Sequence, residues 1–222
     1  MSNSTPGRGR EGGQATRLPD SVRSSLRAVV DARFGQSTSA PEAFFAEQAP
    51  TISQACWAMA KRFHRGGRLL AFGNGASATD AQHVSVEFVH PVIVGKRALP
   101  ALALTNDSAA LSSPAAGGAG PAFARQLAAL ARPQDIALGF SVDGRSANVV
   151  EALRAAKGMG LLTLGMAGGD GGEMSRARLD FSFVVPSRDA FVVQEVHETL
   201  YHVLWELVHI FFEHEGLLDS TA

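Results

Sequence analysis

A single cysteine, Cys56, is present among the 222 residues of the chain. An intrachain disulfide and a metal cluster built on thiolates are therefore both excluded. A surplus of charge is also lacking, because the formal net charge is −1, and this gives no electrostatic footprint for nucleic acid or an acidic membrane. No apolar run reaches the roughly 20 residues that span a bilayer. We therefore expect no nucleic-acid partner, no membrane partner and a cytoplasmic location.

The first 17 residues are rich in glycine, serine and arginine and lack the apolar stretch of a secretory signal. We expect residues 1–17 to form a disordered tail and residues 18–222 to form a single domain with an N-terminal helical extension. The spacing of apolar residues is helical from about Leu18 to Arg65. Pro41 is expected to begin a second helix there, because proline is tolerated in a first turn.

From Arg68 onward, short apolar runs alternate with helical patterns. The runs expected to be strands are 69–72, 101–104, 136–140, 161–164 and 181–185. The helices are expected at 80–89, 123–131, 146–157, 173–176 and 191–214. Short, continuously apolar strands are typical of strands buried on both faces. The alternation therefore predicts an α/β fold in which helices enclose a parallel sheet.

Two loops that follow expected strands carry glycine and hydroxyl groups, at residues 73–77 and 141–146. Loops at the carboxyl ends of parallel strands cluster at one edge of the sheet, where ligands bind. An ordinary glycine turn explains the first loop equally well, and Ser146 serves equally well as a helix cap. The two loops together favour an anionic ligand. Neither has the spacing of a nucleotide-binding motif.

His83 and Glu87 are four residues apart on an expected helix, so they project from the same face. Such a pair can share a metal ion or a substrate proton, although an exposed pair on a helix surface has the same spacing. The last expected helix holds His197, His202 and His209 among its polar residues, in an otherwise apolar sequence. Polar side chains in such a helix need partners. Spacing alone does not choose among these histidines.

Two separated motifs resemble a known family. GNGASATDAQHVSVEF, at 73–88, resembles the GNGGSAADAQHFAAEL signature of bacterial phosphoheptose isomerases, members of the sugar isomerase (SIS) domain superfamily. VPSRDAFVVQEVHETLYH, at 185–202, resembles their second signature, in which VPS is followed by a RIQE-x-H segment and a final histidine. The resemblance extends over about residues 45–215, and the two motifs occur in the family's order.

The resemblance implies a three-layer αβα sandwich with a five-stranded parallel sheet, N-terminal helices and a long C-terminal helix. It also implies a homotetramer with active sites at subunit interfaces, a sugar-phosphate substrate and a bound Zn²⁺ ion. The matching metal ligands are His83, Glu87, Gln194 and His202, of which Glu87 and His202 also carry the proton transfers. The residues implied to line the sugar phosphate are Asn74, Gly75, Ser77, Glu87, Asn106, Asp107, Ser141, Ser146 and Gln194.

Three segments depart from the family pattern. The family's phosphate loop STSGNS is replaced by SVDGRS at 141–146, where Asp143 repels a phosphate unless Arg145 offsets it. Arg145 can instead grip the phosphate with two hydrogen bonds. The family's ANDYGYDEVFARQ is replaced by a Gly/Ala-rich segment at 114–126, expected to be mobile, and the arginine before the second motif's glutamine is missing. We expect the reaction class to be kept and the substrate to be open to change.

The leading hypothesis is an aldose–ketose isomerase that converts sedoheptulose 7-phosphate, or a closely related sugar phosphate, to D-glycero-D-manno-heptose 7-phosphate through an enediolate. The alternative is a non-catalytic SIS-domain regulator that binds a sugar phosphate. The changed loops favour this alternative, whereas His202 argues against it, because relatives that regulate replication lack that histidine. A metal hydrolase is disfavoured because no nucleophile-activating constellation is evident.

Overall fold

A computed structural model describes residues 18–112 and 121–219. The expected tail, 1–17, and residues 114–120 of the Gly/Ala segment lie outside the described residues. The chain divides into two units, residues 1–36 and 37–222. The helices are α1 (Asp20–His64), α2 (Ala76–Val89), α3 (Ser108–Ser112), α4 (Ala122–Leu130), α5 (Ala147–Gly158), α6 (Gly172–Ser175) and α7 (Ala190–Glu213), followed by a 3₁₀ turn at Glu215–Leu217. The strands are β1 (Leu69–Gly73), β2 (Ala101–Ala103), β3 (Ile136–Ser141), β4 (Leu162–Gly168) and β5 (Phe181–Val185).

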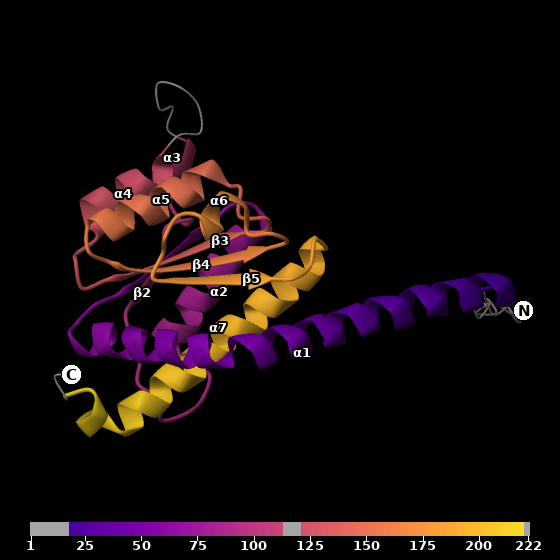
Figure 1. Cartoon of the computed structure of the whole chain (residues 1–222), viewed down its shortest axis with the longest axis horizontal. Coiled ribbons are helices and arrows are strands. Elements are labelled where there is room, and N and C mark those ends of the chain that lie inside the picture. Colours follow the sequence, from indigo (N-terminus) through magenta and orange to yellow (C-terminus); the bar gives the residue numbers. More distant parts are fainter. Residues whose placement is uncertain (1–17, 113–120, 220–222) are drawn as a thin grey trace, which may run out of the picture. The chain divides into compact units, whose positions relative to one another are not determined.

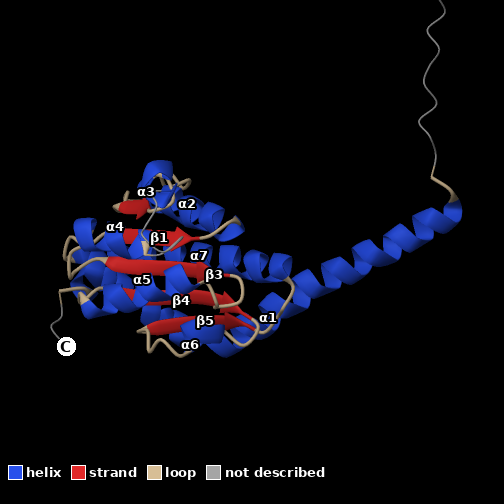
Figure 2. Ribbon diagram, turned by 90° about the horizontal axis from the view of Figure 1, so that it is seen from above, coloured by secondary structure: helices blue, strands red, loops and turns tan. Residues whose placement is uncertain are grey.

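The five strands form one parallel sheet in the order β2-β1-β3-β4-β5 (Figure 2). Every residue of β1, β3 and β4 is buried, which explains their continuous apolar sequences. The prediction of a five-stranded parallel sheet is confirmed. Because the strands are parallel, the loops after β1, β3, β4 and β5 all leave from the same edge, and these loops build the candidate site.

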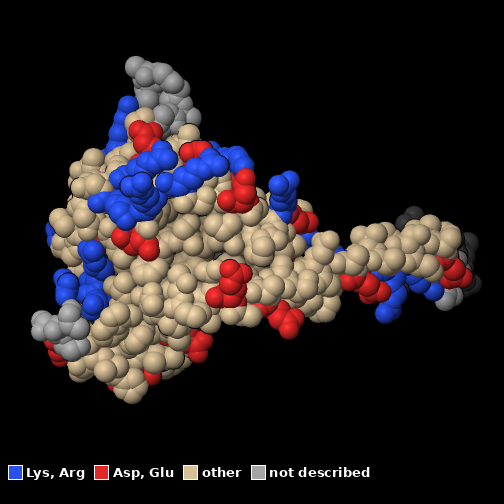
Figure 3. Space-filling model, viewed as in Figure 1, with Lys and Arg blue, Asp and Glu red and all other residues tan. Residues whose placement is uncertain are grey.

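Two apolar cores lie on opposite faces of the sheet. One core joins the sheet to α2, α7 and the second half of α1, and the other joins it to α4, α5 and α6 (Figure 1). Lys and Arg side chains gather over the α4–α5 layer in the view of Figure 3, with Asp and Glu side chains among them. No helix among the described residues is both long enough and apolar enough to cross a membrane.

Two carboxylates, of which that of Asp135 is buried, fasten the amino ends of neighbouring strands. Asp135, directly before β3, accepts hydrogen bonds from the backbone N–H of Arg68, before β1, at 2.9 Å and from its guanidinium at 2.7 Å. Asp180, directly before β5, accepts from the backbone N–H and the hydroxyl of Thr163 in β4 at 2.9 and 2.7 Å. These contacts fix the strands at the edge opposite the candidate site.

Helix α1 continues without a break through Pro41 and Pro50, so the prediction that Pro41 begins a second helix is wrong. A proline removes one helical hydrogen bond, but its fixed φ is compatible with a helix. The turns after Pro41 bury Phe44, Ile52 and Met59 in the first core, and we infer that this packing outweighs the lost bond. In the first unit, the same helix exposes an apolar series. Its members are Val22, Leu26, Val29, Val30 and Phe34.

The remaining elements agree with the predictions within a few residues, with two exceptions. Helix α2 begins at Ala76 and not near Asp80, so Ser77 lies in its first turn. Helix α3, at Ser108–Ser112, was not predicted, because five residues are too few to show a helical period.

Candidate functional site

The loop between β1 and α2 offers an open backbone. Gly75 has a φ of +56°, a conformation that favours glycine, and a Cβ built there would meet nothing within 4 Å. Ser77 follows in the first turn of α2 and is buried. The side-chain amide of Asn74 exchanges two hydrogen bonds, of 2.8 and 3.0 Å, with that of Asn148 in α5. This pair ties the first predicted ligand loop to the helix that follows the second.

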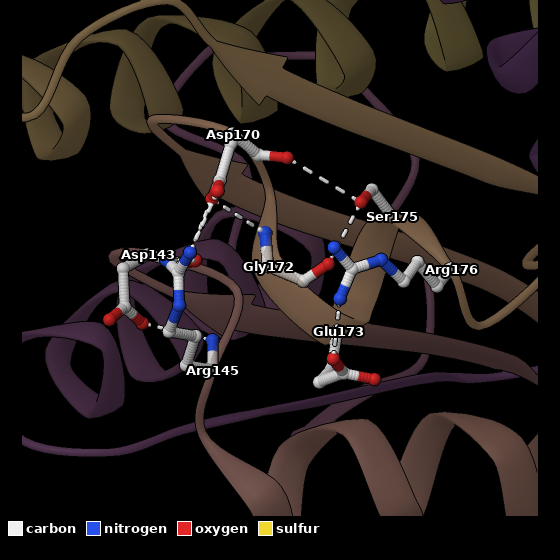
Figure 4. A network of polar contacts seen from close by, with 7 residues as sticks. All are labelled: Asp143, Arg145, Asp170, Gly172, Glu173, Ser175 and Arg176. Carbon is white, nitrogen blue, oxygen red and sulfur yellow. Dashed lines mark hydrogen bonds and ion pairs between the residues drawn. The ribbon is translucent and has the colours of Figure 1, made fainter.

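The loop between β3 and α5 holds its polar side chains in local contacts. The hydroxyl of Ser141 donates to that of Ser146 at 3.0 Å. Ser146 stands at the cap position of α5, but its side chain makes no capping hydrogen bond, so the proposed capping role is wrong. The guanidinium of Arg145 binds both carboxylate oxygens of Asp170 at 2.8 Å, while Asp143 accepts from the Arg145 backbone N–H (Figure 4). Arg145 is thus held by the loop after β4.

Two cavities flank Val142 in this loop. The larger, of about 340 Å³, lies among the loops that follow β3, β4 and β5, and both Arg145 and Arg188 line it. The smaller, of about 80 Å³, is lined by the start of α2 and the first turns of α7, including Ser77, Asp80 and Gln194. A ligand that touches Ser77 therefore has room on both sides of Val142.

His83 lies at the centre of the polar contacts between α2 and α7. Its Nε2 is 3.3 Å from Oε1 of Glu87, and its Nδ1 is 2.7 Å from the hydroxyl of Tyr201. Oε1 of Glu198 lies 3.6 Å from the same Nδ1. The Glu87 side chain is only 14% exposed, and its backbone carbonyl accepts from the indole of Trp205. The two helices therefore meet around one imidazole ring.

Three potential metal ligands gather at this point. His83, Glu198 and His202 each offer one ligand atom, and these atoms lie within 4.8 Å of one another. The rings of His83 and His202 are 5.3 Å apart between centroids. The predicted ligands His83 and His202 are thus brought together, with Glu87 hydrogen-bonded to His83. Glu198 lies with them, although it was not among the predicted ligands.

The other two histidines of α7 have structural partners. His197 is buried, and burial lowers its pKa to about 4 despite a hydrogen bond to the carbonyl of Ala167. His209 is also buried and contacts the backbone carbonyls of Trp205 and Arg97. Of the three, only His202 is exposed and adjacent to His83. His202 is therefore the histidine of α7 that remains a candidate ligand beside His83.

Negative charge concentrates between the helices. Gln194 donates from Nε2 to Asp80 at 3.0 Å, and Asp80 is buried. Burial raises the pKa of Asp80, the hydrogen bond from Gln194 opposes this, and Glu198 adds to the rise. Burial also raises the pKa of Tyr201, as do the carboxylates of Glu198, Asp80 and Glu87. A cation would relieve this accumulation of carboxylates, and the nitrogen and oxygen donors suit zinc.

Asn106 and Asp107 lie in the loop that follows β2. The Asp107 carboxylate accepts from the backbone N–H of Ala110 and so caps α3. Asp107 lines a third cavity, of about 380 Å³, together with Arg125 and Gln126. Within the described residues of one chain, this cavity has no lining residue in common with the one that contains Ser77 and Gln194.

Sequence reasoning gave no role to Asp80, Asn148, Glu198 or Tyr201. Three of them stand inside the two recognised motifs: Asp80 in the first, and Glu198 and Tyr201 in the second. Their roles depend on partners in another element, and such partners leave no spacing signal. Asn148 lies outside both motifs, so no signal indicated it.

The fold and the grouped side chains define a SIS-domain protein, and the sequence matches the SIS domain family over residues 34–168. The chain is 42% identical over 180 residues to the phosphoheptose isomerase of Solidesulfovibrio magneticus, covering 80% of this chain and 87% of that protein. It is 40% identical over 199 residues to that of Desulfovibrio desulfuricans, covering 89% and 94%. The structure of phosphoheptose isomerase GmhA from Neisseria gonorrhoeae superposes with a TM-score of 0.76 at 33% identity, covering 82% of this chain and 98% of that one. The chain belongs to the phosphoheptose isomerase family of SIS-domain proteins.

Proposed function

We propose that this chain interconverts sedoheptulose 7-phosphate, or a closely related ketose phosphate, and D-glycero-D-manno-heptose 7-phosphate. The observation that carries the proposal is the meeting of His83, Glu87 and His202 beside the loops at the carboxyl ends of β1 and β3. Family membership at about 40% identity supports the same reaction class, that of an aldose–ketose sugar-phosphate isomerase. Nothing in the comparisons supports the non-catalytic regulator.

The reaction moves a proton from the hydroxyl-bearing carbon beside the ketone to the carbon that carried the ketone oxygen. In our assignment Glu87 removes the proton from the carbon beside the ketone and returns it to the neighbouring carbon, because a partly buried carboxylate is suited to act as a base. His202 exchanges the hydroxyl proton, so that the ketone becomes an alcohol and the alcohol an aldehyde. Ser77, Gly75 and the 141–146 loop hold the remote phosphate and orient the chain of carbons.

We assign Zn²⁺ as the cofactor, with His83, Glu87, Gln194 and His202 as the residues that hold it. When bound, zinc supplies a Lewis acid that stabilises negative charge on the substrate oxygens. Its support here is the close group of His83, His202 and Glu198, the hydrogen bond between His83 and Glu87, and the negative charge around Tyr201. Glu87 cannot bind the metal and accept a proton at the same moment, so we infer that it fills the two roles at different stages of turnover.

The proposal includes a homotetramer with active sites at subunit interfaces and a cytoplasmic location. The exposed apolar series on α1, which includes Val22, Leu26 and Phe34, supports self-association, because large apolar side chains at helical spacing favour burial against a partner. In the part of the chain that the structure describes, the cavity lined by Asp107 and Arg125 shares no lining residue with the Ser77 cavity, which is also in keeping with a site that two chains complete. A cytoplasmic location follows from the substrate, since a charged sugar phosphate stays where it is made.

The test is conversion of sedoheptulose 7-phosphate by purified, zinc-loaded protein, with other ketose phosphates beside it. We expect aldose formation and about one zinc ion for each site. Glu87→Gln should lower kcat by about 10²–10⁴-fold, the usual contribution of a general base. Glu206→Gln, the same change at an exposed position of α7, serves as the matched control and should leave kcat unchanged. Zinc-loaded protein that converts no ketose phosphate would reject the enzyme.

A further inference from the structure

Tyr201 is the only tyrosine in the chain, and it lies between the two histidines of the candidate site. Its ring meets that of His202 edge-on, with centroids 4.9 Å apart and planes at 79°. It meets the ring of His83 at 5.3 Å and 75°. A third ring, Phe140 at the end of β3, packs against it at 6.2 Å and 88°. Tyr201 is 1% exposed, so these contacts hold the ring in one place.

The Tyr201 hydroxyl forms a hydrogen bond with one of the two ring nitrogens of His83. The hydroxyl oxygen lies 2.7 Å from Nδ1, which is a short and well-formed hydrogen bond. Nε2 points to the other side, where Oε1 of Glu87 lies 3.3 Å away. Each nitrogen of the imidazole therefore has its own partner, a phenol on one side and a carboxylate on the other.

Two carboxylates lie beside the imidazole ring of His83, one near each nitrogen. Glu198 approaches on the Nδ1 side, at 3.6 Å, and Glu87 on the Nε2 side, at 3.3 Å. Because the Tyr201 hydroxyl already occupies Nδ1 at the shorter distance, Nε2 is the nitrogen left for a ligand. The contact thus favours Glu87 as the carboxylate that shares a ligand with Nε2 of His83, although Glu198, and not Glu87, belongs to the group of ligand atoms within 4.8 Å that includes both histidines.

We propose that Tyr201 is a positioning residue whose hydroxyl holds Nδ1 of His83 and directs Nε2 toward Glu87. This inference rests on the proposed function, because it concerns the same metal and proton-transfer site. A hydroxyl can both donate and accept, so it holds the ring in either tautomer. Without a metal it donates to Nδ1 while Nε2–H faces the Glu87 carboxylate. If a metal bound Nε2, the single ring proton would be on Nδ1, and this Nδ1–H would donate a hydrogen bond to the phenol oxygen.

The first test measures zinc affinity by competition with a chromophoric chelator. Tyr201→Phe removes the hydroxyl and keeps the ring, and we expect it to weaken zinc binding about 10–100-fold, the usual effect of losing the partner that orients a ligating histidine. Thr199→Val is the matched control, because it also removes a hydroxyl from α7, at an exposed position where the group bonds only its own helix. Thr199→Val should bind zinc like the wild type.

Two carboxamide variants test the choice of nitrogen. Glu87→Gln should weaken zinc binding more than Glu198→Gln does, and it should alter the visible spectrum of the cobalt-substituted protein more strongly. The reverse order, combined with an unchanged affinity in Tyr201→Phe, would place the metal on the Nδ1 side and overturn the inference. Circular dichroism of each variant establishes that the fold is intact.

A second measurement needs no metal. Nitrogen-15 spectra of the metal-free protein report which ring nitrogen of a neutral histidine carries the proton, and His83→Gln identifies the signal. We expect His83 in the Nε2–H form, and a mixture of tautomers in Tyr201→Phe. The same tautomer population in both proteins would overturn the role of Tyr201 while leaving the proposed isomerase intact. A zinc-loaded wild type that converts no ketose phosphate would reject the isomerase, and the spectra would still decide the Tyr201 contact.

Discussion

Replacement of Asp135 by alanine should destabilise the protein without harming its chemistry. Asp135 is fully buried before β3 and accepts from the backbone N–H groups of Arg68 and Arg132, each at 2.9 Å, and from the Arg68 guanidinium at 2.7 Å. Asp135→Ala leaves three donors without their acceptor. Losing one partner of a buried ion pair costs about 3–5 kcal/mol. The Arg68 side chain is 33% exposed and regains water, so we expect a value near the lower limit.

A loss of about 3 kcal/mol corresponds to a fall of roughly 6–12 °C in the unfolding midpoint of a protein of this size. Differential scanning calorimetry of the two proteins measures it. Glu173→Ala, which removes an exposed ion pair with Arg176, is the control and should shift the midpoint less, because exposed pairs contribute roughly 0–1 kcal/mol. Asp135 lies at the amino ends of the strands, so kcat at 25 °C should stay at the wild-type value.

The sign of the pH effect follows from the pKa of Asp135. Burial opposes its ionisation, but the hydrogen bonds from Arg68 and from the two backbone N–H groups outweigh burial and hold the pKa below its usual value. This contribution to stability is present above the unfolded pKa of about 3.9 and disappears as the pH falls through the lower folded value. A midpoint that drops by less than about 2 °C at pH 7 would refute the view that this carboxylate fastens β1 to β3.

Two further predictions concern the loops and α7. Asp143→Ser restores a hydroxyl to the 141–146 loop and removes a negative charge from it. Because a hydrogen bond to a charged group contributes roughly 1.5–3 kcal/mol, KM for sedoheptulose 7-phosphate should fall about tenfold at constant kcat. A raised KM would contradict this prediction. Burial lowers the pKa of His197 from 6.5 to about 4. As the pH falls from 6.5 to 4, the unfolded chain takes up a proton at this histidine before the folded chain does, so the free energy of unfolding should fall by about 3 kcal/mol. His197→Asn should abolish that part of the pH dependence in urea titrations, and an unchanged slope would show that His197 is charged when folded.

The parallel sheet could be predicted from the sequence because its strands are short, continuously apolar and separated by glycine or by polar turns. The end of β1 at Gly73 lies within one residue of its predicted end, whereas α2 begins at Ala76, four residues before its predicted start. The continuation of α1 through Pro41 could not be predicted in the same way. A prediction from the proline alone considers the hydrogen bond that it removes from a helix. It does not include the burial of Phe44 and Met59, which occurs only in the folded core.

The candidate ligands His83 and His202 could be found because each stands in a recognisable motif. The contacts that decide how they act could not, because they join residues far apart in the chain. Tyr201 and His83 are separated by 118 positions, as are Trp205 and Glu87. A helix places residues three and four apart on one face, but it contains no information about which face of another helix will meet it. The packing of α2 on α7 brings the phenol of Tyr201 to one nitrogen of His83, and Glu87, on the same helix as His83, covers the other. The partner of each ring nitrogen of His83 is therefore set by the interface between two helices.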